Sequence, residues 1–118
     1  MTVKRGDVVL ARVPHIAGSR GKRRPAVVIQ GDVYNVTLRH VVVAEVTSNP
    51  RWRGDPACLF IDISTADGRA TGLHQNGAVS CLHLVTMSED RIGNVIGALS
   101  GSLLQKLDPC LKAALGMP

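Results

Sequence analysis

Aromatic residues are scarce in this chain of 118 residues: they make up 3% of it, as Tyr34, Trp52 and Phe60. A core must therefore be built from aliphatic side chains, and β-branched residues among them favour strands. With 45% apolar residues and no low-complexity tract, the chain has enough apolar mass for a core. We expect one compact domain over residues 1–118.

Long hydrophobic runs are also missing. The longest run falls far short of the roughly 18 residues that a membrane-spanning helix needs. The first seven residues are charged where a signal peptide would turn apolar. The lack of a long apolar run and of a signal peptide predicts a cytoplasmic protein that does not associate with a membrane.

Cysteine occurs three times, as Cys58, Cys81 and Cys110, with wide gaps and no Cys-x-x-Cys pair. The odd count argues against a disulfide framework, and the spacing argues against a zinc site, so we expect no metal. A nucleophilic role for Cys81 is the alternative to packing. Because Cys81 lies in an apolar run, it is better explained as a small core residue.

Charge is unevenly distributed along the chain, whose net charge is +5. Residues 1–53 hold ten Lys or Arg against three acids, and residues 54–118 hold four against six. A basic half on a small protein favours a polyanionic partner, most often nucleic acid. Charge alone does not distinguish RNA, DNA and an acidic protein.

Short apolar segments separated by turn residues predict a mainly β fold. We expect strands over residues 8–13, 25–30, 40–47, 57–63, 78–85 and 92–99. Residues 31–39 are expected to be a connection, Asp67-Gly68 a turn, and residues 88–91 a single helical turn. The segment Arg5-Gly6-Asp7 is expected to be a turn that opens the first strand.

The C-terminal residues change to a helical period. Five leucines from Leu103 to Leu115 fall on one face, and Gly116 is a typical helix end. Ser102 and Gln105 have the spacing of a capping box. Pro109 interrupts this pattern, which predicts either a bent helix or a short helix followed by another.

Two cationic segments are the candidate binding residues. In GSRGKRRPAVVIQ, residues 18–30, Pro25 biases Arg24 towards an extended conformation. An Arg held there offers a phosphate a planar fork of donors that keeps its charge. In NPRWRGDP, residues 49–56, cations flank Trp52, as in platforms on which bases stack. The alternatives are a solvated basic loop and a Trp that covers the core.

The order of these segments resembles the MazF/PemK family of toxin endoribonucleases over nearly the whole chain. Three segments carry this resemblance most specifically. Arg24-Pro25 begins a Val-rich strand, Thr47-Ser48-Asn49 ends another, and Arg5-Gly6-Asp7 precedes the first strand. The resemblance implies an α+β, mainly β fold: an SH3-like, partly open β-barrel of the CcdB/PemK type with a C-terminal helix. It also implies a homodimer, a cognate MazE-like antitoxin and cleavage of single-stranded RNA without a metal or other cofactor. The implied products carry a 2′,3′-cyclic phosphate and a 5′-hydroxyl.

The resemblance carries catalytic roles to Arg24 and Thr47, and a place near the phosphate to Ser19. In such a reaction the 2′-hydroxyl attacks phosphorus, so the protein supplies donors to the transition state and proton transfer, not a nucleophile. Arg20 stands where many members have Glu, which leaves the general base unassigned. The expected RNA-binding residues are Lys22, Arg23, Ser48, Asn49, Arg51, Trp52, Arg53 and His83.

Two other functions compete with this one. A toxin similar to the CcdB gyrase poisons would share the barrel but act by binding a protein through the C-terminal helix. An inactive nucleic-acid-binding relative would explain Arg20 and the break at Pro109. The basic loop together with Arg24 and Thr47 favours the endoribonuclease, since a protein-binding module needs neither.

Overall fold

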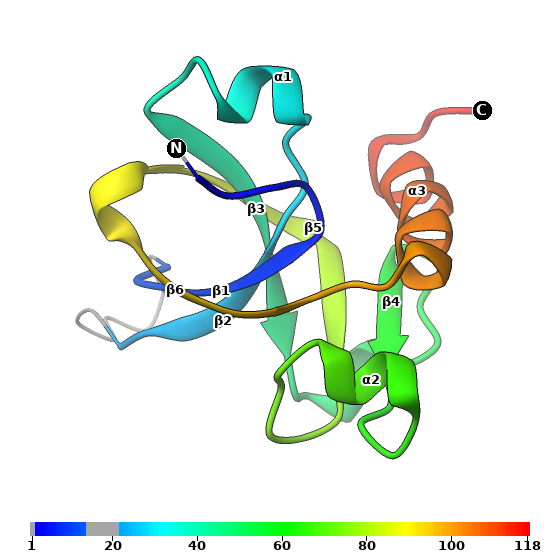
Figure 1. Ribbon diagram of the computed structural model, residues 1–118. Helices are drawn as coiled ribbons and strands as arrows, with labels where there is room; N and C mark the ends of the chain where they lie inside the picture. The colour runs from blue at the N-terminus through cyan, green and yellow to red at the C-terminus, as the bar shows by residue number, and fades with distance from the viewer. Residues whose placement is uncertain (1, 14–21) are drawn as a thin grey trace.

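The computed structural model describes residues 2–13 and 22–118. These residues form six strands, one long helix and four short helical segments (Figure 1). The strands are β1 (Asp7–Ala11), β2 (Arg24–Val28), β3 (His40–Thr47), β4 (Cys58–Ile61), β5 (Gly77–Ser88) and β6 (Ile92–Ala98). The long helix is α3 (Gly101–Leu115), and the short segments are α1 (Asp32–Asn35), α2 (Ala66–Ala70), η1 (Pro50–Trp52) and η2 (Glu89–Arg91).

The described strands pair antiparallel in one strongly curved sheet, in the order β4-β5-β3-β2-β1-β6 (Figure 1). The edge strands β4 and β6 do not pair with each other, so the barrel is partly open. The predicted α+β fold, an SH3-like open barrel with a C-terminal helix, is confirmed. None of the helices in the described part of the chain is long and apolar enough to cross a membrane.

The central strands are buried on both faces. Val27 and Ala44 contribute to a core shared with α3, whereas Val28 and Val43 contribute to a second core on the opposite face. Strands covered in this way are apolar over consecutive residues instead of alternating. This burial explains why the Val-rich runs were good predictors of β2 and β3.

Two short helices were missed. Residues 32–35 form α1 where a connection was expected, and residues 66–70 form α2 where Asp67-Gly68 was expected to be a turn. The Thr65 hydroxyl caps α2 by accepting a hydrogen bond from the Gly68 amide, 2.9 Å away. A side chain at Gly68 would collide with the Asp62 carbonyl, because a Cβ there would lie 1.8 Å from that oxygen. Helices of four or five residues are too short to show a helical period of apolar residues in the sequence.

Helix α3 packs beside β4 and buries Leu103, Leu107 and Cys110 (Figure 1). Its N-cap is Ser100, whose hydroxyl accepts from the Leu103 amide, so the predicted cap at Ser102 is wrong. The helix is continuous through Pro109, which rules out two successive helices. Pro109 and Gln105 are exposed, so water can satisfy the carbonyl that the proline leaves unpaired. Gly116 ends the helix in the left-handed conformation, as predicted.

Leu107→Ala tests how much α3 contributes to stability. Leu107 is fully buried, so we expect the free energy of unfolding to fall by about 2 to 5 kcal/mol in urea denaturation followed by circular dichroism. Leu115→Ala, on the same helix but 59% exposed, is the matched control and should change it by less than about 0.5 kcal/mol. Equal effects would contradict the packing described here.

Candidate nucleic-acid interface

A groove of about 570 Å³ lies where β2 begins and β3 ends. It brings together six of the residues singled out from the sequence: Arg24, Thr47, Ser48, Asn49, Trp52 and His83. Its other lining residues are Leu10, Pro25, Glu45, Val46, Leu73, His74, Gln75, Asn76, Gly77 and Ile96. A cavity of this size accommodates a drug-sized ligand or a few groups of a larger one.

The register of β2 with β3 sets the relation between the two predicted catalytic residues. Ala26 lies opposite Glu45 in this antiparallel pair. Continuing the register by two residues places Arg24 opposite Thr47. Side chains two residues apart on a strand share a face, so Arg24, Glu45 and Thr47 lie on one face of the sheet.

Arg24 is held in an extended strand and its side chain is partly buried. The following residue, Pro25, pairs with Leu10 of β1. The Arg24 Nε is buried and has no hydrogen-bond partner among the described residues. Because an unpaired buried donor costs stability, this nitrogen is well suited to an incoming anion.

Thr47 stands at the end of β3, next to the turn that leads into η1. Its Oγ1 accepts a hydrogen bond of 3.2 Å from the Asn49 amide. The Asn49 side chain in turn caps η1 by accepting from the Arg51 amide at 3.0 Å. The Thr47 oxygen is thereby oriented, while its hydroxyl hydrogen remains available to a ligand in the groove.

An irregularity in β5 positions His83. Ala44 pairs with Leu84 but the next residue, Glu45, pairs with Ser80, so residues 81–83 bulge out of the β3 pairing. The Ser80 hydroxyl and His83 Nδ1 are hydrogen-bonded at 2.8 Å across this bulge. Bulges of this kind often redirect a side chain beside a functional site.

Trp52 and His83 form the aromatic part of the groove. Their ring centroids are 5.9 Å apart at an interplanar angle of 78°, an edge-to-face arrangement. The Arg51 guanidinium lies 4.8 Å from the centre of the Trp52 ring. Trp52 is only partly buried, so a flat ligand can reach it.

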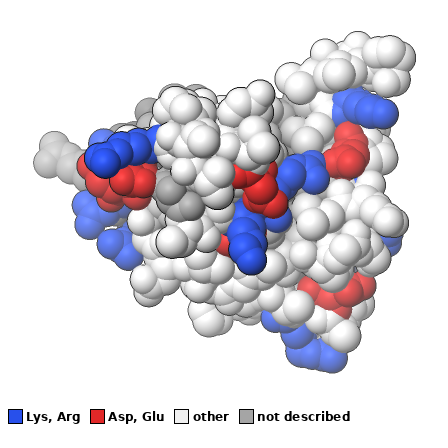
Figure 2. Space-filling model, turned by 45° about the horizontal axis from the view of Figure 1, so that its top comes forward, with Lys and Arg blue, Asp and Glu red and all other residues white. Residues whose placement is uncertain are grey.

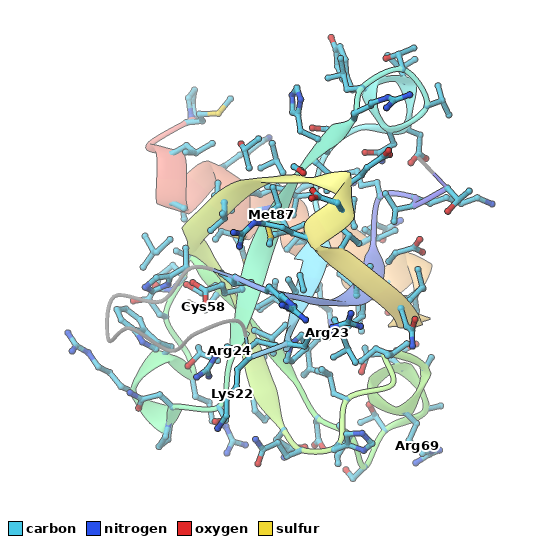
Figure 3. All side chains as sticks on the ribbon, turned by 90° about the vertical axis from the view of Figure 1, so that its left-hand side faces the viewer. Lys22, Arg23, Arg24, Cys58, Arg69 and Met87 are labelled. Carbon is cyan, nitrogen blue, oxygen red and sulfur yellow. The ribbon has the colours of Figure 1, made fainter. Side chains whose placement is uncertain are left out.

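The other predicted cations lie around the groove, not in its lining. Arg53 lies over the Phe60 ring, 4.0 Å from its centroid, and lines a smaller hollow that also contains Thr47, Ser48 and Asn49. Lys22 and Arg23 are exposed just before β2 (Figure 3), and the Arg23 guanidinium lies against Gly93 of β6. The predicted site residue Ser19 lies outside the described residues.

On the face that carries α1, acidic and basic side chains are interspersed (Figure 2). There Arg5 pairs with Asp108 at 2.6 Å, and its backbone amide donates to Asp32. That hydrogen bond, together with one from the Asn35 side chain, holds the pKa of Asp32 below its usual range. The charge imbalance seen along the sequence is therefore not a uniform basic surface.

Several lining residues were not singled out from the sequence. Glu45 stands two residues before Thr47, so strand alternation alone would have placed it on the same face. The loop residues His74, Gln75 and Asn76 reach the groove through the tertiary fold, and nothing in their local sequence indicates it.

All three cysteines are buried, and Cys81 and Cys110 belong to the core that packs against α3. Burial, with smaller contributions from the neighbouring Cys110 and Cys58 thiols, raises the pKa of the Cys81 thiol to about 12. Burial also raises the pKa values of Cys58 and Cys110. The expectation that Cys81 is a core residue is confirmed, and a thiol with a raised pKa is a poor nucleophile.

Comparison with known families decides what this groove belongs to. Residues 4–115 match the family described as PemK-like, MazF-like toxins of type II toxin–antitoxin systems. The chain belongs to this family. The resemblance inferred from the motifs is thereby confirmed, since the match covers nearly the whole chain.

Individual relatives within the MazF-like family agree. Endoribonuclease MazF6 of Mycobacterium tuberculosis is 29% identical over 119 residues, which covers 99% of this chain and 100% of the relative. Endoribonuclease EndoA of Bacillus subtilis is 28% identical over 118 residues, covering 99% and 97%. Both relatives are named endoribonucleases.

Solved structures share the fold. The Mycobacterium tuberculosis toxin MazF-mt6 has a TM-score of 0.77 at 24% identity, with 95% of this chain and 98% of that chain covered. A mycobacterial endoribonuclease in complex with its cognate antitoxin has a TM-score of 0.78 at 20% identity, covering 99% and 98%.

Thiol reactivity tests the burial of the cysteines. With a pKa of about 12 for Cys81, only about one thiol in ten thousand is ionised at pH 8, so native protein should react very slowly with Ellman's reagent. The same protein in guanidinium chloride, the control, should react rapidly at all three cysteines. Rapid modification of Cys81 in the native protein, mapped by mass spectrometry, would contradict this description.

Proposed function

We propose that the chain is the toxin of a type II toxin–antitoxin system and cleaves single-stranded RNA, mRNA included, without a metal ion. The observation that carries the proposal is that Arg24 and Thr47 line one groove, within a chain of the MazF-like family. The curated relatives are named endoribonucleases, which supports the same reaction class.

The proposed reaction uses the RNA's own nucleophile. The 2′-hydroxyl oxygen attacks the adjacent phosphorus and the bond from phosphorus to the 5′-oxygen breaks, giving a 2′,3′-cyclic phosphate and a 5′-hydroxyl. Arg24 donates to the non-bridging oxygens as their charge grows, and the Thr47 hydroxyl supplies a second donor. Ser19 is proposed to contact the same phosphate.

The remaining groove residues are proposed to hold the strand. Trp52 offers a stacking surface, which contributes on the order of 1 to 3 kcal/mol per base, and His83 presents a polar edge beside it. Lys22, Arg23, Arg51 and Arg53 attract phosphates from outside the groove, and Ser48 and Asn49 position the nucleotide beside Thr47.

A MazE-like antitoxin and a homodimer complete the proposal. A structural relative has been solved with its cognate antitoxin. In this chain, an acidic peptide that orders on binding would be attracted by the cations around the groove and would exclude RNA. The CcdB-like alternative gains no support from the groove, because a protein-binding module needs neither Arg24 nor Thr47.

The mechanism predicts cleavage that resists EDTA. Purified protein incubated with defined RNAs in EDTA should give fragments ending in a 2′,3′-cyclic phosphate and beginning with a 5′-hydroxyl, mapped by mass spectrometry. An RNA with a single 2′-deoxy substitution at the scissile nucleotide should bind but stay intact, because its nucleophile is missing. Cleavage of that substituted RNA would overturn the mechanism.

Arg24→Ala tests the phosphate donor. We expect the single-turnover cleavage rate to fall about 100- to 1000-fold, as for other preorganised donors, while RNA affinity falls only a few-fold. Arg69→Ala removes the same charge from α2, well away from Arg24 (Figure 3), and should cleave at the wild-type rate. An Arg24→Ala protein that still arrests growth would instead favour a toxin that acts by binding a protein.

A further inference from the structure

Glu45 supplies the one carboxylate that lines the groove within residues 2–13 and 22–118. It lies on β3 opposite Ala26 of β2 and opposite Ser80 of β5. Thr47 follows on the same face about 6.6 Å along the strand, at about 3.3 Å per residue. If a phosphate binds at Arg24 and Thr47, Glu45 therefore lies two residues from Thr47 along β3. At that distance its carboxylate can reach the ribose attached to the phosphate.

The Glu45 carboxylate is not neutralised by the cation nearest to it in the register. Glu45 is partly buried, and none of the described residues forms an ion pair or hydrogen bond with its carboxylate; the ion pair of the described chain joins Arg5 to Asp108. Arg24, on the same face of the next strand, keeps its Nε unpaired as well. Within the described residues, Arg24 and Glu45 therefore share a groove without pairing with each other, which leaves both side chains available to a bound ligand.

We propose that Glu45 is the general base of the reaction, a proposal that rests on the proposed function. Its carboxylate takes the proton from the 2′-hydroxyl as the 2′-oxygen forms its bond to phosphorus. The bond from phosphorus to the 5′-oxygen breaks, and that oxygen takes a proton from water. Glu45 then returns its proton to solvent, so the enzyme is unchanged after each turnover.

The two histidines that line the groove are placed for different tasks. His83 has its Nδ1 bonded to Ser80 and its ring in an edge-to-face contact with Trp52, an arrangement that suits contact with a base. His74 is exposed on the loop before β5. Arg24 from β2, Thr47 on β3, and Ser80 and His83 from β5 are polar and charged groups of the strands around Glu45. A base on β3 also removes the need for an acid at position 20, where this chain has Arg.

Glu45→Gln is the sharpest test, because it preserves the shape of the side chain and removes its ability to accept a proton. With an RNA carrying the cut site mapped for the wild-type protein, the single-turnover rate should fall about 100-fold or more. Affinity for the 2′-deoxy form of that RNA should stay within about threefold. The acidic limb of the pH–rate profile should disappear, and Glu45→Asp should retain that limb at a reduced rate.

The chain offers a matched control, since its only other glutamate is Glu89, exposed on η2. Glu89→Gln should cleave like the wild type. If the wild type gives cyclic-phosphate ends but Glu45→Gln keeps its rate and pH profile, the assignment of Glu45 is overturned and the proposed function stands. A changed cut sequence with an unchanged rate would likewise overturn it, by making Glu45 a base-reading residue.

A wild-type protein that leaves no cyclic-phosphate ends would overturn the proposed function itself, and the base with it. Circular dichroism of each variant separates loss of chemistry from loss of folding. If Glu45→Gln does not fold, Glu45→Asp decides the matter: a wild-type rate with no acidic limb in its profile would contradict the proposal.

Discussion

The antiparallel pairing of β2 with β3 determines the geometry on which the groove depends. The pairing is held by burial on both faces, because Val27 and Ala44 enter the core beneath α3 while Val28 and Val43 enter the opposite core. A slip of one residue would exchange these sets between faces and expose both. The polar ends of the same strands are therefore locked in register by apolar residues that never meet a ligand.

The bulge in β5 determines where the aromatic part of the groove lies. Cys81 stays in the core and its amide donates to the Ala57 carbonyl, so β5 remains attached to β4 within the bulge. Leu82 and His83 turn outwards at the same place, and the Ser80 hydroxyl steadies the imidazole. The position of the aromatic part of the groove thus depends on the anchoring of Cys81 in the core, which gives this cysteine a structural role without chemistry.

The sequence was sufficient for the parts of the molecule that repeat or carry a strong motif. Apolar runs predicted the strands, the leucine period predicted α3, and the Arg24-Pro25 and Thr47-Ser48-Asn49 motifs led to the family. The N-cap of α3 was predicted wrongly, because both Ser100 and Ser102 are suitable capping residues. In the structure Ser100 caps the helix, and the Ser102 hydroxyl instead donates to Asp67, a tertiary contact that the sequence does not reveal.

The unpredicted part of the site comes from contacts between distant segments. His74 reaches the groove from beyond α2, a helix too short to show a period, and His83 does so through a bulge that no alternation pattern reveals. Glu45 is different, since its place two residues before Thr47 was available from the strand alone. Glu45 belongs to none of the motifs that carry the family resemblance, and it stands out only once the strand register sets it near Arg24.

The residues that attract RNA lie apart from those proposed to carry out its cleavage. The groove lining itself combines Arg24 with Glu45, so it is nearly balanced in charge, whereas Lys22, Arg23, Arg51 and Arg53 lie around it. The electrostatic attraction of exposed cations extends over about 8 Å at physiological ionic strength and is weakened by salt. The attraction between the partly buried Arg24 and a phosphate bound to it is screened much less. Added salt should therefore weaken capture of RNA before it alters the bound phosphate. A strand of any sequence can be attracted by the outer cations, and only one seated against Trp52 and His83 would bring its 2′-hydroxyl within reach of Glu45.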